Sequence, residues 1–151
     1  MVDDAPSLLI GDANGERLEI RALRRSHPDA SDFWDANWIE SDVLLHVGGF
    51  RARYRASLRS DEFRSFREQV QGLEEARRDA ASFATMEGQL AFALTLDKRG
   101  RVGVEGSARD DAGSRNALAF AFEIDATYIP AILRSLNDLA RKYPVVGGPD
   151  A

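Results

Sequence analysis

Alternation of apolar and polar residues dominates this chain and predicts a β-rich protein. A period of two residues is typical of strands that bury one face and expose the other. The two clearest segments flank Gly48-Gly49, a pair that predicts a tight hairpin turn. Seven segments are predicted to be strands: residues 8–10, 17–23, 42–47, 50–58, 89–96, 101–105 and 117–124.

Two other segments show apolar residues three and four positions apart, which is the spacing of one helix face. The first is predicted to run over residues 61–78, after a possible N-cap at Ser60. Its apolar stripe is Phe63, Phe66, Val70 and Leu73. The second is predicted over residues 128–141, and Pro144 ends it.

The order of these elements indicates the fold class. Strands follow one another without a helix between each pair, so a parallel, doubly wound sheet is not expected. We predict an α+β fold with a single antiparallel β-sheet and two α-helices packed on one face. A chain of 151 residues is most simply one domain. Residues 1–7 and 146–151 are expected to be frayed tails.

Composition removes most common kinds of catalysis. The chain has no cysteine, which excludes disulfides, thiolate zinc sites and cysteine nucleophiles. Its two histidines, His27 and His46, do not form a His-x-x-x-His pair, and no Gly-x-Ser-x-Gly elbow or glycine-rich phosphate loop is present. We therefore predict no catalytic residues, no metal, no cofactor and no enzymatic activity.

Charge and hydropathy bear on the compartment. There are 25 acidic and 20 basic residues, and the net charge is −5. No apolar run approaches the roughly 20 residues that a membrane helix needs. The first residues carry Asp3 and Asp4 but no basic residue, unlike a secretory signal. A cytoplasmic protein with no membrane partner is expected.

An acidic segment with two tryptophans is the clearest candidate site. Trp34 and Trp38 lie among five acids: Asp29, Asp32, Asp35, Glu40 and Asp42. Rings that supply buried area, together with carboxylates that steer, suit a surface for a basic protein partner. A solvated acidic loop is the plainer interpretation, and a pair of acids in a hydrolase is a third. The candidate contacts are Asp32, Trp34, Asp35, Glu40 and Asp42; Trp38 is expected in the core, whereas Trp34 is left open.

Arginines on one strand face suggest an alternative function. Arg51, Arg53 and Arg55 alternate along the segment 50–58, so they share a face that could bind an anionic ligand or RNA. RNA-binding sheets usually place aromatic rings between such cations, and this face has none locally. Nucleic-acid binding is therefore disfavoured. Pairing of the arginines with acids on a neighbouring strand, Asp42 for example, is the preferred interpretation.

Several short segments resemble one family of bacterial proteins. Residues 35–39, Asp-Ala-Asn-Trp-Ile, resemble the D-x-N-W-L signature of the WapI-like immunity proteins. Residues 82–87 resemble the family's F-x-x-x-E segment. Residues 116–120 and 125–129 resemble its N-x-L-x-F and D-Q-T-Y-L segments, and Tyr143-Pro144-Val145 matches the family's close. The departures are Ala126, where the family tends to have glutamine, and isoleucine for leucine at positions 39 and 129.

The resemblance implies a function that composition alone does not indicate. It implies a non-enzymatic protein that binds and neutralises a cognate toxin, typically the C-terminal domain of a contact-delivered polymorphic toxin. An acidic inhibitor would suit a basic nuclease domain, because complementary charge speeds association.

Overall fold

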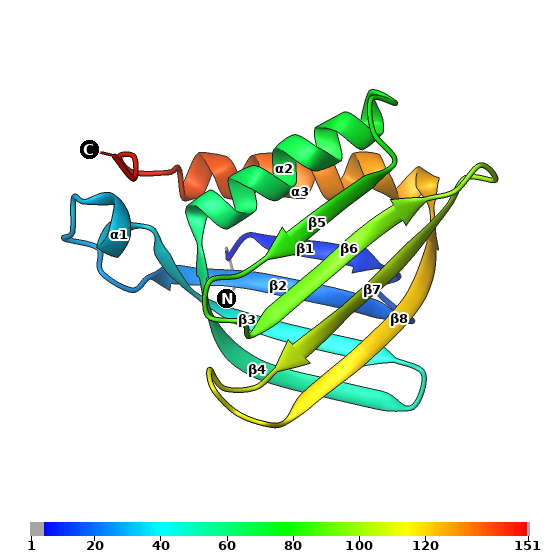
Figure 1. The fold of residues 1–151 in the computed structure, drawn as a ribbon, viewed down its shortest axis with the longest axis horizontal. Coiled ribbons are helices and arrows are strands. Elements are labelled where there is room, and N and C mark those ends of the chain that lie inside the picture. Colours follow the sequence, from blue (N-terminus) through cyan, green and yellow to red (C-terminus); the bar gives the residue numbers. More distant parts are fainter. Residues whose placement is uncertain (1–4, 151) are drawn as a thin grey trace.

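Two antiparallel sheets of four strands each form the protein, in a computed structural model that describes residues 5–150 (Figure 1). Sheet 1 has the order β1-β2-β3-β4 and sheet 2 the order β5-β6-β7-β8. The strands of sheet 1 are β1 (Ser7–Gly11), β2 (Arg17–Arg25), β3 (Trp38–Val47) and β4 (Phe50–Arg59). Those of sheet 2 are β5 (Ala80–Ala84), β6 (Leu90–Leu96), β7 (Arg101–Arg109) and β8 (Ala117–Asp125).

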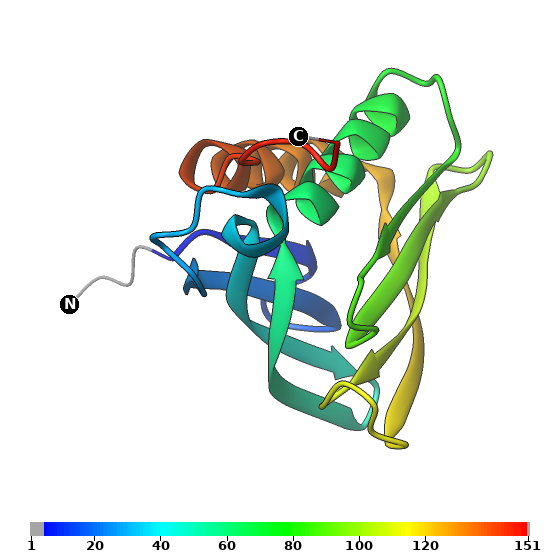
Figure 2. The ribbon, with the colours of Figure 1, turned by 60° about the vertical axis from the view of Figure 1, so that its left-hand side comes forward.

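Two long helices cover the space between the sheets. Helix α2 (Ser60–Glu74) carries the chain from β4 to the second sheet, and α3 (Ile129–Lys142) follows β8 through the short 3-10 helix η1 (Ala126–Tyr128). The helices lie side by side, α2 against β5 and α3 against β1. Figure 2 shows the sheets meeting at an angle, with both helices across the open side. The single-turn helix α1 (Phe33–Ala36), which precedes the others in the chain, stands apart from this layer.

The core fills the space enclosed by the two sheets and the helices. The inward side chains of β3, such as Val43 and Leu45, are fully buried, as their alternation predicts. The predicted stripe of α2 also faces inward, where Phe66 meets the ring of Phe83 edge-on at 5.8 Å and that of Phe92 at 5.3 Å. The apolar faces of both sheets and both helices therefore meet in one core.

The expected single sheet with two helices is wrong. Each group of four consecutive strands pairs only within itself, in chain order. Helix α2 leads the chain from the first sheet into the second rather than back to the first. A period of two shows which face of a strand is buried but not which strand lies beside it. The missed strand, β5, has only five residues, three of them alanine. The missed helix, α1, has a single turn.

The first long helix also ends earlier than expected. It stops at Glu74 instead of near residue 78, so no basic residue lies in its last turn. Gly72 is buried, and a Cβ added there would lie 2.6 Å from Cδ of Arg78. Close packing of the Arg78 side chain over Gly72 thus accompanies the end of the helix.

At the two ends of the chain, residues 1–4 and 151 lie outside the described residues, so the expected tails are only partly described. Near the C-terminus, the backbone N–H of Val146 donates to Oδ1 of Asn37 at 2.8 Å. Within the described chain, none of the helices has the length and apolar character needed to cross a membrane.

One glutamine joins the free edge of sheet 1 to sheet 2. Gln89, just before β6, accepts a hydrogen bond from the backbone N–H of Ser57 at 2.9 Å and donates to the carbonyl oxygen of Arg55 at 3.1 Å. The Tyr54 hydroxyl donates to the Gln89 carbonyl oxygen at 2.7 Å, and burial raises the pKa of that hydroxyl. These bonds satisfy the backbone of β4 at Arg55 and Ser57, part of an edge that would otherwise be open to pairing.

Candidate functional site

The outer face of sheet 1, which points away from the core, carries the arginine stripe and two of the five predicted partner contacts, Glu40 and Asp42. Antiparallel pairing sets the two strands β3 and β4 in register, so each outward residue of one has a partner on the other. The pairs along this face are Trp38 with Arg59, Glu40 with Ser57, Asp42 with Arg55, Leu44 with Arg53 and His46 with Arg51.

In the middle of this face, acids and arginines neutralise one another. Arg55 contacts Oδ1 of Asp42 at 2.9 Å and Oε1 of Glu40 at 3.0 Å. Arg24 of β2 reaches Glu40 at 2.7 Å, and Arg53 lies 3.7 Å from Asp42. The predicted pairing of the arginine stripe with Asp42 holds for Arg53 and Arg55 but not for Arg51. Exposed ion pairs of this kind contribute little to stability, but they remove free charge from the surface.

At one end of the face, a fourth arginine of β4 is completely buried. The side chain of Arg59 donates to the carbonyl oxygens of Trp34 at 2.8 Å and Phe33 at 2.9 Å, and to Asp61 at 2.9 Å. Its guanidinium carbon lies 4.7 Å from the ring centroid of Trp38, and 5.0 and 5.6 Å from those of Phe33 and Trp34. Arg59 therefore clamps the single-turn helix α1 onto the sheet.

Asn37 forms a second attachment for α1. The side chain is fully buried, and it donates to the carbonyl oxygens of Phe33 at 2.8 Å and Val146 at 2.9 Å. A four-residue helix is too short to be stable alone. The contacts of Arg59 and Asn37 explain why this turn has a defined position.

Fixing α1 in this way leaves one aromatic ring and two acids exposed. Trp34 is 51% exposed although its ring meets that of Phe33 edge-on at 5.0 Å. Asp32 caps the helix by accepting from the backbone N–H of Asp35 at 3.1 Å. Neither carboxylate forms an ion pair within residues 5–150. We call Asp32, Trp34 and Asp35 the α1 corner.

A hollow of about 500 Å³ lies next to Trp38, at the end of sheet 1 that carries Arg59, although no residue of the α1 corner lines it. It is bounded by the loop after β2, the ends of β3 and β4, the turn between β5 and β6, and the loop between β7 and β8. Trp38 and three acids, Glu40, Glu87 and Asp111, line it together with His27 and Arg55. We call it the acidic hollow. Its excess of carboxylates favours a cationic partner.

The structure thus divides the five predicted contacts. Asp32, Trp34 and Asp35 lie together on α1, whereas Glu40 and Asp42 lie on β3, bound to arginines. Trp38 is half-buried on the outer face against Arg59, so its expected place in the core is wrong. The sequence shows that Trp38 precedes a strand but not that it would point to the side covered by α1.

A half-buried carboxyl links the end of β4 to the turn between β5 and β6. Glu62 accepts from the backbone N–H of Arg59 at 2.9 Å and from that of Met86 at 2.6 Å. Burial raises the pKa of Glu62 to about 7, although the two backbone hydrogen bonds favour the charged form and act against this rise. In the described part of the chain, no three carboxylate or histidine side chains are grouped so that they could hold a metal ion.

A family model for the WapI-like immunity proteins matches residues 8–144. The chain belongs to this family. The match covers all of the described elements from β2 to α3, including the α1 corner. The resemblance noted in the sequence is confirmed. No curated protein matches this WapI-like chain.

The solved structures that match this chain do so weakly. MRP1/MRP2 of Trypanosoma bruciei is 11% identical, with a TM-score of 0.49 over 93% of this chain and 86% of that chain. A guideRNA-binding protein complex bound to a gRNA is 11% identical, with a TM-score of 0.49 over 94% of this chain and 92% of that chain. A CdiA-CT/CdiI toxin and immunity complex from Enterobacter cloacae is 11% identical, with a TM-score of 0.42 over 66% of this chain and 88% of that chain. These similarities are weak, so the family assignment rests on the sequence match.

Two residues of this WapI-like protein that sequence reasoning missed are Arg59 and Asn37. Arg59 continues the spacing of Arg51, Arg53 and Arg55, which is a signal that it shares their face. Nothing in the local sequence shows that a segment more than twenty residues earlier covers it. Asn37 lies within a segment that resembles the family, but the sequence does not indicate its bonds to residue 146.

Proposed function

We propose that this immunity-family protein binds and neutralises a cognate toxin domain without catalysing a reaction, through the α1 corner and the acidic hollow at the same end of sheet 1. The observation that carries the proposal is Trp34, an exposed ring on a backbone held in place by buried hydrogen bonds. A preorganised aromatic residue loses little entropy on binding and is the residue type most enriched at binding hot spots.

Charge supports a basic partner. Asp32, Asp35, Glu87 and Asp111 surround the exposed ring and the hollow, and none forms an ion pair among the residues described. Carboxylates at the edge of an interface speed association with a basic surface. A basic nuclease domain is one such toxin, and neutralisation would take place in the cytoplasm.

Co-expression with the toxin encoded beside this gene tests the function. The intact protein should rescue cells from the growth arrest that the toxin causes, and the purified pair should form a complex in a pull-down. If the protein neither rescues growth nor binds that toxin, the proposed function is wrong.

Matched aromatic variants test the surface. Trp34→Ala should weaken toxin binding at least tenfold, as expected for a central aromatic anchor. Phe50→Ala removes a ring that is 64% exposed at the opposite end of β4 and should change the affinity less than twofold. Equal affinities of the two variants would place the interface elsewhere while leaving the immunity function intact.

Matched charge variants separate steering from contact. Asp32→Asn with Asp35→Asn should slow association and reduce its salt dependence. Glu74→Gln with Glu105→Gln, at exposed positions on α2 and β7, removes the same charge and should have a smaller effect. The same slowing in both pairs would show that net charge, not the α1 corner, governs the encounter.

A further inference from the structure

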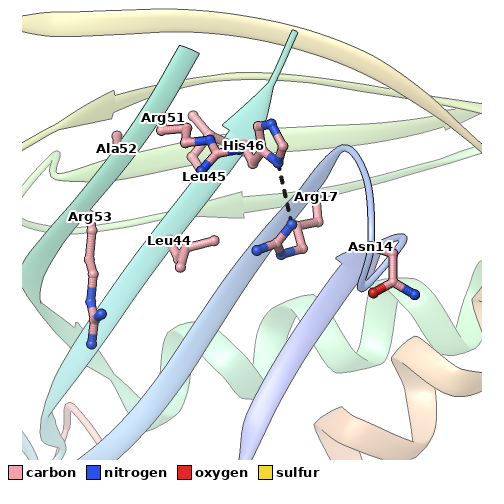
Figure 3. A pocket seen from close by; sticks show the side chains of 8 residues that line it. All are labelled: Asn14, Arg17, Leu44, Leu45, His46, Arg51, Ala52 and Arg53. Carbon is pink, nitrogen blue, oxygen red and sulfur yellow. Dashed lines mark hydrogen bonds between the residues drawn. The ribbon is translucent and has the colours of Figure 1, made fainter. Parts of the chain in front are cut away.

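A second hollow lies on the outer face of sheet 1, at the hairpin between β3 and β4. Its volume is about 450 Å³. Figure 3 shows the side chains that line it: Asn14, Arg17, Leu44, Leu45, His46, Arg51, Ala52 and Arg53. We call it the basic hollow, because three of the eight residues are arginines and none is an acid.

Strand register places two arginines and a histidine in one row across three strands. Arg17 of β2 is opposite His46 of β3, which is opposite Arg51 of β4. Neighbours in such a row have Cβ atoms roughly 5 Å apart, so the two arginines lie on either side of His46. An anion bound over the row would be within reach of both guanidinium groups and of the imidazole.

The row is partly organised in advance. Arg17 donates to the carbonyl oxygen of Gly15 at 3.0 Å, and the same Nη1 lies 3.4 Å from Nδ1 of His46 (Figure 3). Arg51 has no hydrogen bond or ion pair through its side chain within residues 5–150. One guanidinium is therefore held in place and another is free to close on a ligand.

Three carboxylates lie near this end of the sheet, but none of them lines the hollow. Glu16 accepts from the backbone N–H of Gly48 at 3.0 Å, and Asp42 is bound to Arg55 at 2.9 Å. Glu19 shares the outer face of β2 but does not line the hollow. Arg53 lies 3.7 Å from Asp42 and points along the face away from His46, so it forms the rim (Figure 3).

We propose that the basic hollow binds a phosphate group, held mainly by Arg17, His46 and Arg51. Guanidinium groups form paired hydrogen bonds with phosphate oxygens, and an imidazole adds a further donor. The hollow is larger than a phosphate alone, and Leu44 gives it an apolar part that suits the organic portion of a phosphate ester. This site differs from the expected stripe because Arg55 is already neutralised and Arg17 and His46 replace it. It does not depend on the proposed toxin binding.

Three probes distinguish the possible sources of the phosphate: inorganic phosphate, adenosine monophosphate and an eight-nucleotide single-stranded RNA. Binding is measured by calorimetry, and the imidazole signals of His46 in NMR spectra report whether the probe occupies the hollow. At least one probe should shift those signals. The tightest probe identifies the source, and a strong salt dependence confined to the RNA would indicate a nucleic-acid backbone.

Variants assign the binding to these residues. Arg17→Ala with Arg51→Ala should weaken the tightest probe at least tenfold, and Arg51→Glu, at an exposed hairpin position, should do so without affecting β2. Arg55→Ala is the matched control on the same strand and face, and should change the affinity less than twofold. If no probe shifts His46, or if the double variant binds as well as the original protein, the site is not a phosphate site. Rescue from the toxin should be unchanged in the Arg17→Ala, Arg51→Ala double variant and in Arg51→Glu.

Discussion

The two ends of β4 place the same residue type on the same face in opposite environments. Arg59 is fully buried beneath α1, with three hydrogen bonds and three aromatic rings around its guanidinium. Arg51 is exposed, and its side chain has no partner in the described part of the chain. Between them, Arg55 is exposed and bound to two acids. The positions 51 and 59 are roughly 26 Å apart along an extended strand.

This difference shows that the covering segment, not the strand, decides what each arginine does. A buried guanidinium loses its hydration and is tolerated only when hydrogen bonds and rings replace the water. At one end of β4, the α1 turn supplies hydrogen-bond acceptors and aromatic rings to Arg59, and the same contacts fix the position of α1. At the hairpin end nothing covers the row, so its charge remains available to a ligand.

The largest expected effect is the loss of the buried arginine. Arg59→Ala leaves two carbonyl oxygens and Asp61 without their donor, and should lower the free energy of unfolding by about 3–5 kcal/mol, as for other broken buried pairs. Arg51→Ala should change it by no more than about 0.5 kcal/mol. Urea unfolding of both variants measures the contrast. Similar small losses would mean that the burial of Arg59 does not hold α1.

The second test asks whether Arg59 holds α1 alone. Asn37→Ala removes three hydrogen bonds at a fully buried position, to Phe33 and to the backbone of Val146. We expect a loss of about 2–3 kcal/mol in unfolding free energy, the cost of buried groups left unpaired. Asn14→Ala, at an exposed turn of the basic end, is the control and should be near neutral. A neutral Asn37→Ala would leave Arg59 as the only anchor.

A third test uses the pH dependence of stability that Glu62 should cause. The pKa of Glu62 is raised to about 7 in the folded protein, so the folded state binds its proton more tightly than the unfolded state does. Glu62 should therefore make the protein less stable as pH rises from about 4.5 to 7, by up to about 1 kcal/mol per pH unit. Urea midpoints across this range should fall for the original protein and stay flatter for Glu62→Gln. Parallel slopes in the two proteins would contradict the assignment.

The smallest effect is expected in the middle of the face. Arg55→Ala removes exposed ion pairs with Asp42 and Glu40, so it should lower stability only slightly, and by less at high salt. Thermal unfolding at two salt concentrations measures this. A larger, salt-independent loss would show that Arg55 resembles Arg59 rather than a surface residue.

Local features of the fold were predictable because they depend on neighbouring residues. The alternation in residues 42–47 and 50–58 and the Gly48-Gly49 turn predict the β3–β4 hairpin, and its register makes the contact between Arg55 and Asp42 expected. The inward stripe of α2 follows from its spacing in the same way. In each case the partner is a few residues or one hairpin away.

Features that depend on distant partners were not predictable from one sequence. The division into two sheets depends on where α2 delivers the chain, and β5 is too short and too rich in alanine to stand out. The candidate site changed for the same reason. Trp34 and Trp38 are four residues apart, yet one projects from α1 and the other lies against the sheet beneath Arg59.

The sequence by itself determined the strands' buried faces, the long helices, the exclusion of cysteine chemistry and, through its short motifs, the WapI-like immunity family. Only the tertiary structure decided which of the arginine side chains on β4 are buried, which are paired with acids and which have no partner among the described residues. Burial of a charge depends on which segments meet over it, and here residues 33–37, 59 and 146 come together from distant parts of the chain. The same packing leaves Trp34 exposed at one end of sheet 1 and the row of Arg17, His46 and Arg51 uncovered at the other.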